Sequence, residues 1–91
     1  MMTKEMILEL MNSCEDILVD EYSDGNIHVT IDDFAGFGDD WEEIYNDIDE
    51  EQIDSILETL DKECVKKDDD FYVDYCFDGF KVCVGWSSFD I

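Results

Sequence analysis

Residues 71–86 read FYVDYCFDGFKVCVGW. Apolar and polar residues alternate on both sides of Asp78-Gly79, a dipeptide that favours the two-residue type I′ turn of a β-hairpin. Counting outward from this turn predicts four cross-strand pairs on one buried face: Phe77 with Phe80, Tyr75 with Val82, Val73 with Val84, and Phe71 with Trp86. The sequence therefore predicts a C-terminal hairpin with one apolar face.

A second hairpin is predicted between residues 17 and 31, where two alternating segments flank Asp24-Gly25. If these two residues form the turn, Tyr22 pairs with Ile27 and Leu18 pairs with Ile31. We therefore expect those four side chains on one face of the sheet.

Three segments have the 3.6-residue period of amphipathic helices. The first begins at Thr3 as its N-cap and places Ile7, Leu10, Met11 and Cys14 on one face. The other two begin at capping-box-like patterns, Asp40 to Glu43 and Asp49 to Gln52. The second helix would be short and bury Trp41, Ile44, Tyr45 and Ile48, and the third would carry a stripe of Ile53, Ile56, Leu57, Leu60 and Cys64.

These elements follow one another in the order α-β-β-α-α-β-β. The simplest arrangement is an α+β fold, in which two β-hairpins form an antiparallel sheet of about four strands and two or three helices pack on one face. A chain of 91 residues has the usual length of one domain, so we expect residues 1–91 to form a single acidic domain.

The charge of the chain is extreme. It contains 27 Asp and Glu residues against five lysines and no arginine, which gives a formal net charge of −22. A chain with that charge and few apolar residues would be disordered, but 45% of these residues are hydrophobic. We therefore expect a folded domain whose surface charge determines its partners.

The acidic residues are concentrated in the middle of the sequence. Ten carboxylates lie between residues 32 and 51, where there is no lysine. On the third predicted helix a carboxylate ladder recurs opposite the apolar stripe, with rungs roughly 4.5 to 6 Å apart, at Asp47, Glu51, Asp54, Glu58 and Asp61. Phosphates follow one another at about 3.4 Å along a DNA strand, and the neighbouring acids of residues 39–50 would bring the array close to that density.

Other kinds of site have less support in the sequence. An EF-hand count from Asp47 to Glu58 places Gln52 where the calcium loop needs glycine, so we expect no metal site and no cofactor. Residues 34–38 contain glycine but neither the lysine nor the hydroxyl of a P-loop. His28 is expected beside Glu21 on the paired strand rather than in a catalytic role. Cys14, Cys64, Cys76 and Cys83 form no CxxC motif, and we expect free thiols.

The small size, the α+β pattern, the dense acids and the scarcity of basic residues resemble a class of proteins. The chain is similar to the acidic inhibitors that phages and mobile elements encode, including DNA-mimic and anti-CRISPR proteins. The resemblance is carried by Asp32-Asp33, by residues 39–43 (DDWEE), by residues 47–51 (DIDEE) and by the ladder to Asp61. It implies occlusion of the nucleic-acid channel of a nuclease, polymerase, restriction enzyme or CRISPR effector.

We therefore expect a non-enzymatic inhibitor that binds a basic nucleic-acid-binding protein and does not bind nucleic acid itself. The expected partner-binding residues are Asp32, Asp33, Asp39, Asp40, Trp41, Glu42, Glu43, Asp47, Asp49, Glu50, Glu51, Asp54, Glu58 and Asp61. One alternative is an immunity or antitoxin protein that neutralises a basic toxin through a local patch. The other is a solvated acidic domain without such a partner. Phe34, Phe37 and Trp41 either cap the core or anchor the interface.

The sequence has no segment with the features of a signal peptide and no run of about 18 apolar residues. We therefore expect a cytoplasmic protein, in the host cytosol if it is encoded by a phage, with no membrane partner.

Self-repulsion among the carboxylates predicts that the melting temperature rises as sodium chloride is added between low and moderate ionic strength, because salt screens the like charges. Calorimetry or circular dichroism over a salt series at pH 7 measures this rise. A melting temperature that stays flat or falls would contradict clustered, repelling charge.

Overall fold

The structure is a computed structural model that describes residues 2–21 and 24–89. Within these residues the fold is α+β, with two α-helices, α1 (Lys4–Asn12) and α2 (Glu50–Asp61). The main sheet has five strands in the spatial order β1-β2-β7-β6-β5. These strands are β1 (Ile17–Glu21), β2 (Ile27–Ile31), β5 (Val65–Asp68), β6 (Tyr72–Phe77) and β7 (Phe80–Trp86).

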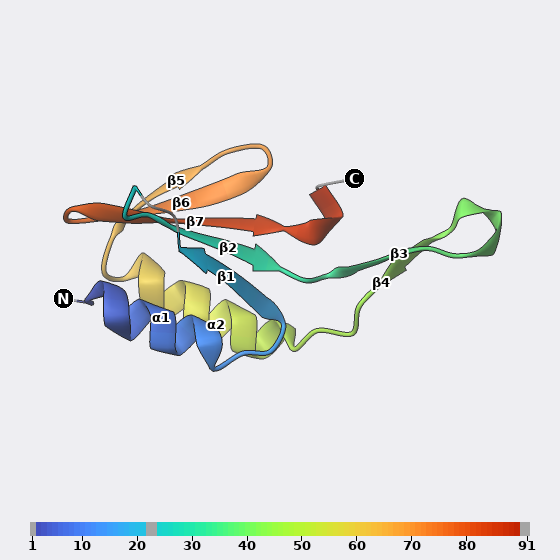
Figure 1. Cartoon of the computed structure of the whole chain (residues 1–91), viewed down its shortest axis with the longest axis horizontal. Helices are drawn as coiled ribbons and strands as arrows, with labels where there is room; N and C mark the ends of the chain where they lie inside the picture. The colour runs from blue at the N-terminus through green and yellow to red at the C-terminus, as the bar shows by residue number, and fades with distance from the viewer. Residues whose placement is uncertain (1, 22–23, 90–91) are drawn as a thin grey trace.

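The sheet is mixed, and the prediction of four antiparallel strands was wrong in this respect. Each hairpin is antiparallel, but β2 and β7 pair in parallel, with Ile27 opposite Val82 and Ile31 opposite Trp86. Because β2 and β7 are far apart in sequence, local turn signals carry no information about the direction in which they meet. Their pairing joins the two hairpins into one sheet (Figure 1).

Both helices cover the same face of this sheet (Figure 1). The core between them is apolar: Ile7 and Met11 of α1 and Ile53, Ile56 and Leu60 of α2 pack with the inward-facing side chains Ile17, Ile27, Val29, Ile31, Tyr75, Val82 and Val84. No charged or polar side chain is buried among the described residues. The acids therefore remain at the surface, as the composition predicted.

The caps of both helices confirm two of the three predicted helix starts. The Met6 N–H donates to Thr3 Oγ1 at 3.2 Å, and the Gln52 N–H donates to Asp49 Oδ1 at 3.1 Å. Each bond satisfies one of the amide groups that a helix N-terminus leaves without an intrahelical acceptor.

The register of the C-terminal hairpin is confirmed at three of its four predicted pairs: Phe77 with Phe80, Tyr75 with Val82, and Val73 with Val84. The fourth was wrong, because β6 begins at Tyr72 and Phe71 lies outside it with 63% of its surface exposed. The ring of Phe71 instead contacts Phe89, in the short 3₁₀ helix η2 (Ser87–Phe89).

The predicted register of the first hairpin was wrong by one residue. Glu21 pairs with Ile27 and Ile17 pairs with Ile31, so Ile17 faces the core and Leu18 is exposed. A one-residue slip exchanges the two faces of a strand, and burial of Ile17 decides between the registers. The predicted partner Tyr22 lies outside the described residues. Asp20, not Glu21, is the cross-strand neighbour of His28.

Strand β5 was not predicted, because Val65-Lys66-Lys67-Asp68 has no alternation of apolar and polar residues. It forms one edge of the sheet and is exposed at all four positions. Charged side chains on an edge strand, lysine above all, discourage pairing with another chain.

The largest difference from the prediction lies where the short second helix was expected to begin at Asp40, because residues 34–45 form an arm instead. Strands β3 (Phe34–Phe37) and β4 (Glu43–Tyr45) pair antiparallel, with the 3₁₀ turn η1 (Asp39–Trp41) between them. The arm projects from the body of the domain (Figure 1), and the described residues extend over 47 × 23 × 22 Å.

Two glycines and the lack of a core surface explain the arm. Gly36 has φ +127°, which side-chain-bearing residues rarely adopt, and it lies at a register shift in the β3–β4 pairing. A Cβ on Gly38 would lie 2.8 Å from Cδ1 of Ile44, so the two strands approach closely there. The helices α1 and α2 already cover the apolar face of the sheet, which leaves no surface for a third helix to bury.

The raised pKa of Tyr75 predicts that the stability of the fold falls at alkaline pH. Burial, followed by the nearby charge of Asp61, raises the pKa of Tyr75 from 10.0 to about 12. Between these values the unfolded chain loses a proton that the folded chain keeps, so the free energy of unfolding should fall by roughly 2 kcal/mol from pH 10 to pH 12.

Urea titrations from pH 9 to pH 12 measure this fall. Tyr75→Phe should reduce the decline with pH more than Tyr45→Phe does, because the raised pKa of Tyr45 belongs to a hydroxyl on the exposed arm, where solvent screens the effect. The same decline in all three proteins would show that Tyr75 is not its source.

Candidate partner-binding surface

The acids predicted to bind a partner form two groups in the structure. The arm group is Asp39, Asp40, Glu42 and Glu43, at and beside the tip of the arm, and all four are exposed. The helix group is Glu50, Glu51, Asp54, Glu58 and Asp61 on α2, and these five are exposed as well. The remaining predicted acids lie at the root of the arm or between the arm and α2.

The arm tip has an unusual backbone. Asp40 has φ 65° and ψ 18°, and Trp41 has φ 61°. Aspartate often adopts this left-handed conformation, but for a bulky residue such as tryptophan it is an outlier that costs on the order of 1 to 3 kcal/mol. The turn is closed by the Gly38 N–H, which donates to the Glu42 carbonyl at 2.8 Å. This turn holds Trp41 outward with 82% of its surface exposed.

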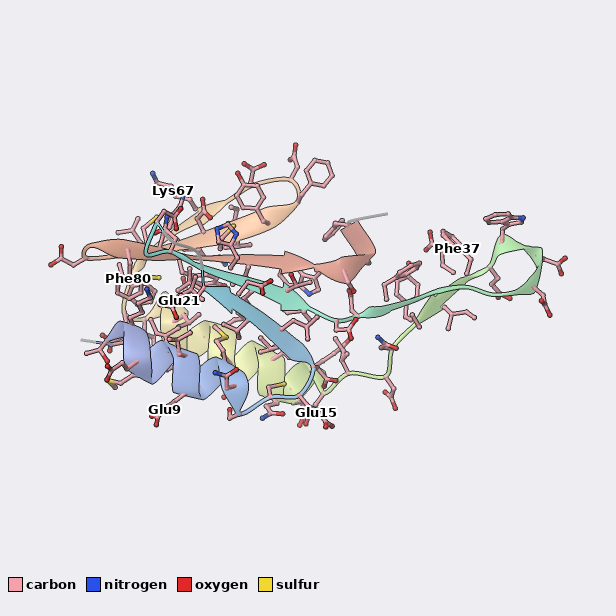
Figure 2. The ribbon with its side chains drawn as sticks, viewed as in Figure 1. Glu9, Glu15, Glu21, Phe37, Lys67 and Phe80 are labelled. Atoms are coloured by element: carbon pink, nitrogen blue, oxygen red, sulfur yellow. The ribbon has the colours of Figure 1, made fainter. Side chains whose placement is uncertain are left out.

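A row of aromatic rings runs along the arm. Phe34 makes edge contacts with Phe37 at 5.5 Å and Tyr45 at 5.9 Å between ring centroids, and Phe37 contacts Trp41 at 5.9 Å. Figure 2 shows Phe37 on the arm, far from the two helices. Phe37 and Trp41 are exposed and lie outside the core cluster. Of the two roles left open by the sequence, capping the core is therefore wrong for these two residues.

Tyr45 joins the aromatic row to the acids. Its hydroxyl donates a hydrogen bond to Glu43. This bond to a carboxylate raises the pKa of Tyr45.

The carboxylate ladder is shorter than predicted. Asp47 precedes α2, which begins at Glu50, so four rungs remain on the helix: Glu51, Asp54, Glu58 and Asp61. They lie on exposed positions between the buried residues Ile53, Ile56 and Leu60. The 12 residues of α2 span about 18 Å and carry five carboxylates, or roughly one per 3.6 Å. As a mean density this is close to the spacing of about 3.4 Å along one DNA strand, but the four rungs themselves are roughly 4.5 to 6 Å apart, and the acids of residues 39–43 that were expected to close those gaps lie on the arm instead.

The helix group borders the root of the arm, whereas the arm group lies at the far end of the arm (Figure 1). A cavity of about 290 Å³ lies at the root, lined by Asp33, Tyr45 and Asn46 and by Glu50 and Asp54 of α2. Asp49 is exposed, but its carboxylate is committed to capping α2. Asp47 is also exposed, between the two groups.

Asp33 differs from the other predicted acids because its carboxylate is used within the fold. One oxygen, Oδ1, accepts from Ser87 Oγ and from the Ser88 N–H, and Oδ2 accepts from Ser88 Oγ, each at 3.0 Å. Ser87 Oγ in turn accepts from the Phe34 N–H at 2.9 Å. These bonds, which we name the Asp33 clasp, fasten the root of the arm to η2. The adjacent Asp32 is half-buried and its carboxylate has no such bonds.

No lysine in the described residues forms an ion pair with either acidic group, although Lys66 lines a cavity with Asp54, Glu58 and Asp61. The lysine ion pairs in the described part of the chain join Lys4 to Glu21, Lys66 to Asp68 and Lys81 to Asp74. None of them reaches an acid of residues 32–61. The negative charge of the arm and of α2 is therefore available to an external partner.

A further set of residues, which sequence reasoning missed, lies on the sheet face opposite the helices. Strand register makes His28 the neighbour of both Asp20 and Cys83, and Cys83 the neighbour of Asp74. Nucleophilic enzymes use such residue types, but they need a thiolate. Here burial and a hydrogen bond to Asp74 raise the pKa of Cys83 to about 11. Only the parallel β2–β7 pairing brings His28 beside Cys83, and no local pattern indicated it.

Three findings complete the description of the surface. No group of three or more His, Cys, Asp or Glu side chains in residues 2–21 and 24–89 is arranged to hold a metal ion. Among the same residues, neither helix has the length and apolar character needed to cross a membrane. Comparisons with protein-family models, curated proteins and solved structures gave no match.

The Asp33 clasp predicts a difference between two adjacent acids. Asp33→Ala removes the acceptor of three hydrogen bonds and should lower the free energy of unfolding by about 1 to 3 kcal/mol. Asp32→Ala removes an equal charge without these bonds and should change stability little. Urea denaturation of both variants measures the difference, and equal losses would show that the clasp does not stabilise the fold.

Proposed function

We propose that this protein is a non-enzymatic inhibitor that binds a basic nucleic-acid-binding protein, such as a nuclease or CRISPR effector, and blocks its access to DNA or RNA. The observation that carries the proposal is the pair of exposed acidic groups on the arm and α2, which no lysine ion pair in the described residues neutralises.

Electrostatics supports this function in two ways. Exposed charge of one sign accelerates association with an oppositely charged groove, by 10-fold to 1000-fold in known cases. A folded carboxylate array also displaces the counterions of a basic groove, as phosphates do, without the entropy cost of ordering a flexible chain. The mean spacing on α2, roughly one carboxylate per 3.6 Å, suits such competition.

The chemistry of the remaining surface supports a binding protein over an enzyme. The Cys83 thiol beside His28 has a pKa raised to about 11 and is protonated at neutral pH, the opposite of an activated nucleophile. Burial also raises the pKa of Cys64.

One observation favours the alternative of an immunity or antitoxin protein. Trp41 is 82% exposed at the end of a strained turn, as a local anchor would be. A local patch predicts that Trp41→Ala alone abolishes binding while charge changes matter little. Binding through charge spread over the arm and α2 predicts the reverse: the charge changes weaken binding and Trp41→Ala alone matters little.

The partner can be isolated by immobilising the chain and capturing proteins from host lysate, with and without excess duplex DNA. The captured protein is then tested for release of a labelled duplex when the free chain is added. If the proposal is right, excess duplex DNA reduces capture of the partner, and release of the labelled duplex is complete when about one equivalent of the chain has been added. Capture that duplex DNA does not reduce would contradict the proposal, and so would a ternary complex of the chain, the captured protein and the duplex.

Three variants with equal loss of charge test whether position matters. The helix variant is Glu51→Gln, Asp54→Asn, Glu58→Gln and Asp61→Asn; the arm variant is Asp39→Asn, Asp40→Asn, Glu42→Gln and Glu43→Gln; the control is Glu5→Gln, Glu9→Gln, Glu15→Gln and Asp78→Asn. All twelve positions are exposed. The helix and arm variants should associate roughly tenfold more slowly at low salt and depend less steeply on salt concentration.

The control should keep most of the association rate of the natural chain. Stopped-flow or surface-based kinetics at several salt concentrations measures these differences. If the control loses as much as the other two variants, net charge alone governs association and the arm and α2 have no special role.

A further inference from the structure

A second aromatic group lies at the other side of the arm root, near the end of β7. It lines an open pocket of about 460 Å³, which we name the aromatic pocket and define by Phe71, Trp86 and Phe89 with Asp69 and Asp70. None of these residues belongs to the acidic groups described above. The pocket also reaches Asp33, whose clasp holds η2 and therefore Phe89 in place.

The rings of the aromatic pocket stand nearly perpendicular to one another. Phe89 meets Phe71 at 6.3 Å and 75°, and Trp86 at 6.4 Å and 88°. Despite these contacts, Phe71 remains 63% exposed and Phe89 53% exposed. The geometry leaves ring surface free to contact a ligand, and aromatic faces attract cations.

Two carboxylates stand in the pocket wall beside the rings. Asp69 and Asp70 are both exposed, and no lysine lines the pocket. The Asp70 N–H donates to Asp69 Oδ1 at 2.7 Å, and the Asp69 N–H donates to the Tyr72 carbonyl at 2.9 Å. These bonds fix the loop in front of Phe71, so the acids are positioned beside the rings before a ligand arrives.

We propose that the aromatic pocket binds the guanidinium group of an arginine side chain presented by a partner polypeptide. A planar guanidinium stacks on aromatic rings and donates paired hydrogen bonds to a carboxylate, whereas the ammonium of lysine is a compact, strongly hydrated charge. Asp69 already accepts from the Asp70 N–H and is hydrogen-bonded to the Tyr72 side chain, so an apolar ligand would leave the Asp70 carboxylate without a counter-charge, and an anionic ligand would be repelled by both acids.

A second copy of this chain is not the occupant. The sequence contains no arginine, and two copies that each carry a formal charge of −22 repel one another. The arginine must therefore come from a different protein. This inference does not depend on the proposed inhibition, since it concerns residues outside the arm and α2.

The test uses three capped peptides, acetyl-Gly-X-Gly-amide, in which X is arginine, lysine or citrulline. Citrulline has nearly the shape of arginine but no charge. Binding is followed by NMR in 150 mM sodium chloride through the indole N–H of Trp86, while the indole N–H of Trp41 reports non-specific condensation of cations on the acidic arm. The two signals are assigned with Trp41→Phe.

The arginine peptide should shift the Trp86 signal saturably, with a dissociation constant of about millimolar order for one such contact. It should bind at least threefold more tightly than the lysine peptide, and the citrulline peptide should cause no shift. Parallel shifts of Trp41 and Trp86, or equal shifts with arginine and citrulline, would overturn the proposal.

Variants locate the binding in the pocket. Phe71→Leu and Asp70→Asn should each weaken binding of the arginine peptide at least threefold, and both positions are exposed, so the fold should tolerate them. Phe37→Leu, at an exposed aromatic position on the arm, is the matched control and should have no effect. Unchanged affinity in Phe71→Leu would also overturn the proposal.

Discussion

The parallel pairing of β2 with β7 is the contact on which the rest of the structure depends. It joins an N-terminal unit, α1 with the β1–β2 hairpin, to a C-terminal unit of α2 and the remaining strands. Because the two strands run in the same direction and Ile31 lies opposite Trp86, the segments that follow them emerge side by side. One is the root of the arm and the other is η2, and the Asp33 clasp joins them. The arm and the aromatic pocket are both consequences of this arrangement.

A second constraint is the separation of charge from the core. The inner face of the sheet and the facing helix stripes are apolar, so hydrophobic burial stabilises the fold while like charges oppose it. The acids on α2 and on the arm repel one another, and binding to a cationic partner would lower their electrostatic free energy. This links the predicted salt dependence of the free chain's stability to its proposed binding, because counter-charge would relieve the same repulsion.

The sequence predicted those elements whose signals are local. Caps at Thr3 and Asp49 with helical periodicity gave α1 and α2, and Asp78-Gly79 gave the register of β6 and β7. Two features of the sheet were not predicted. The β2–β7 pairing joins strands that are far apart in sequence, and edge strand β5 has no alternation of apolar and polar residues. A helix was predicted because Trp41, Ile44, Tyr45 and Ile48 fit a helical stripe, but of these four only Ile48 packs against the core, and the other three are exposed. The predicted acids are all at least partly exposed, but the sequence could not separate Asp33, which serves the fold, from Asp39 and Asp40 at the arm tip.

The central claim is that the arm and α2 together form the surface that a basic partner recognises. The most direct measurement is hydrogen exchange of the chain, free and bound to the protein isolated by DNA-sensitive capture. The account predicts slower exchange on binding in residues 39–45 and along α2, with little change in α1. Protection confined to α1 or to β5, with the arm and α2 unchanged, would contradict it.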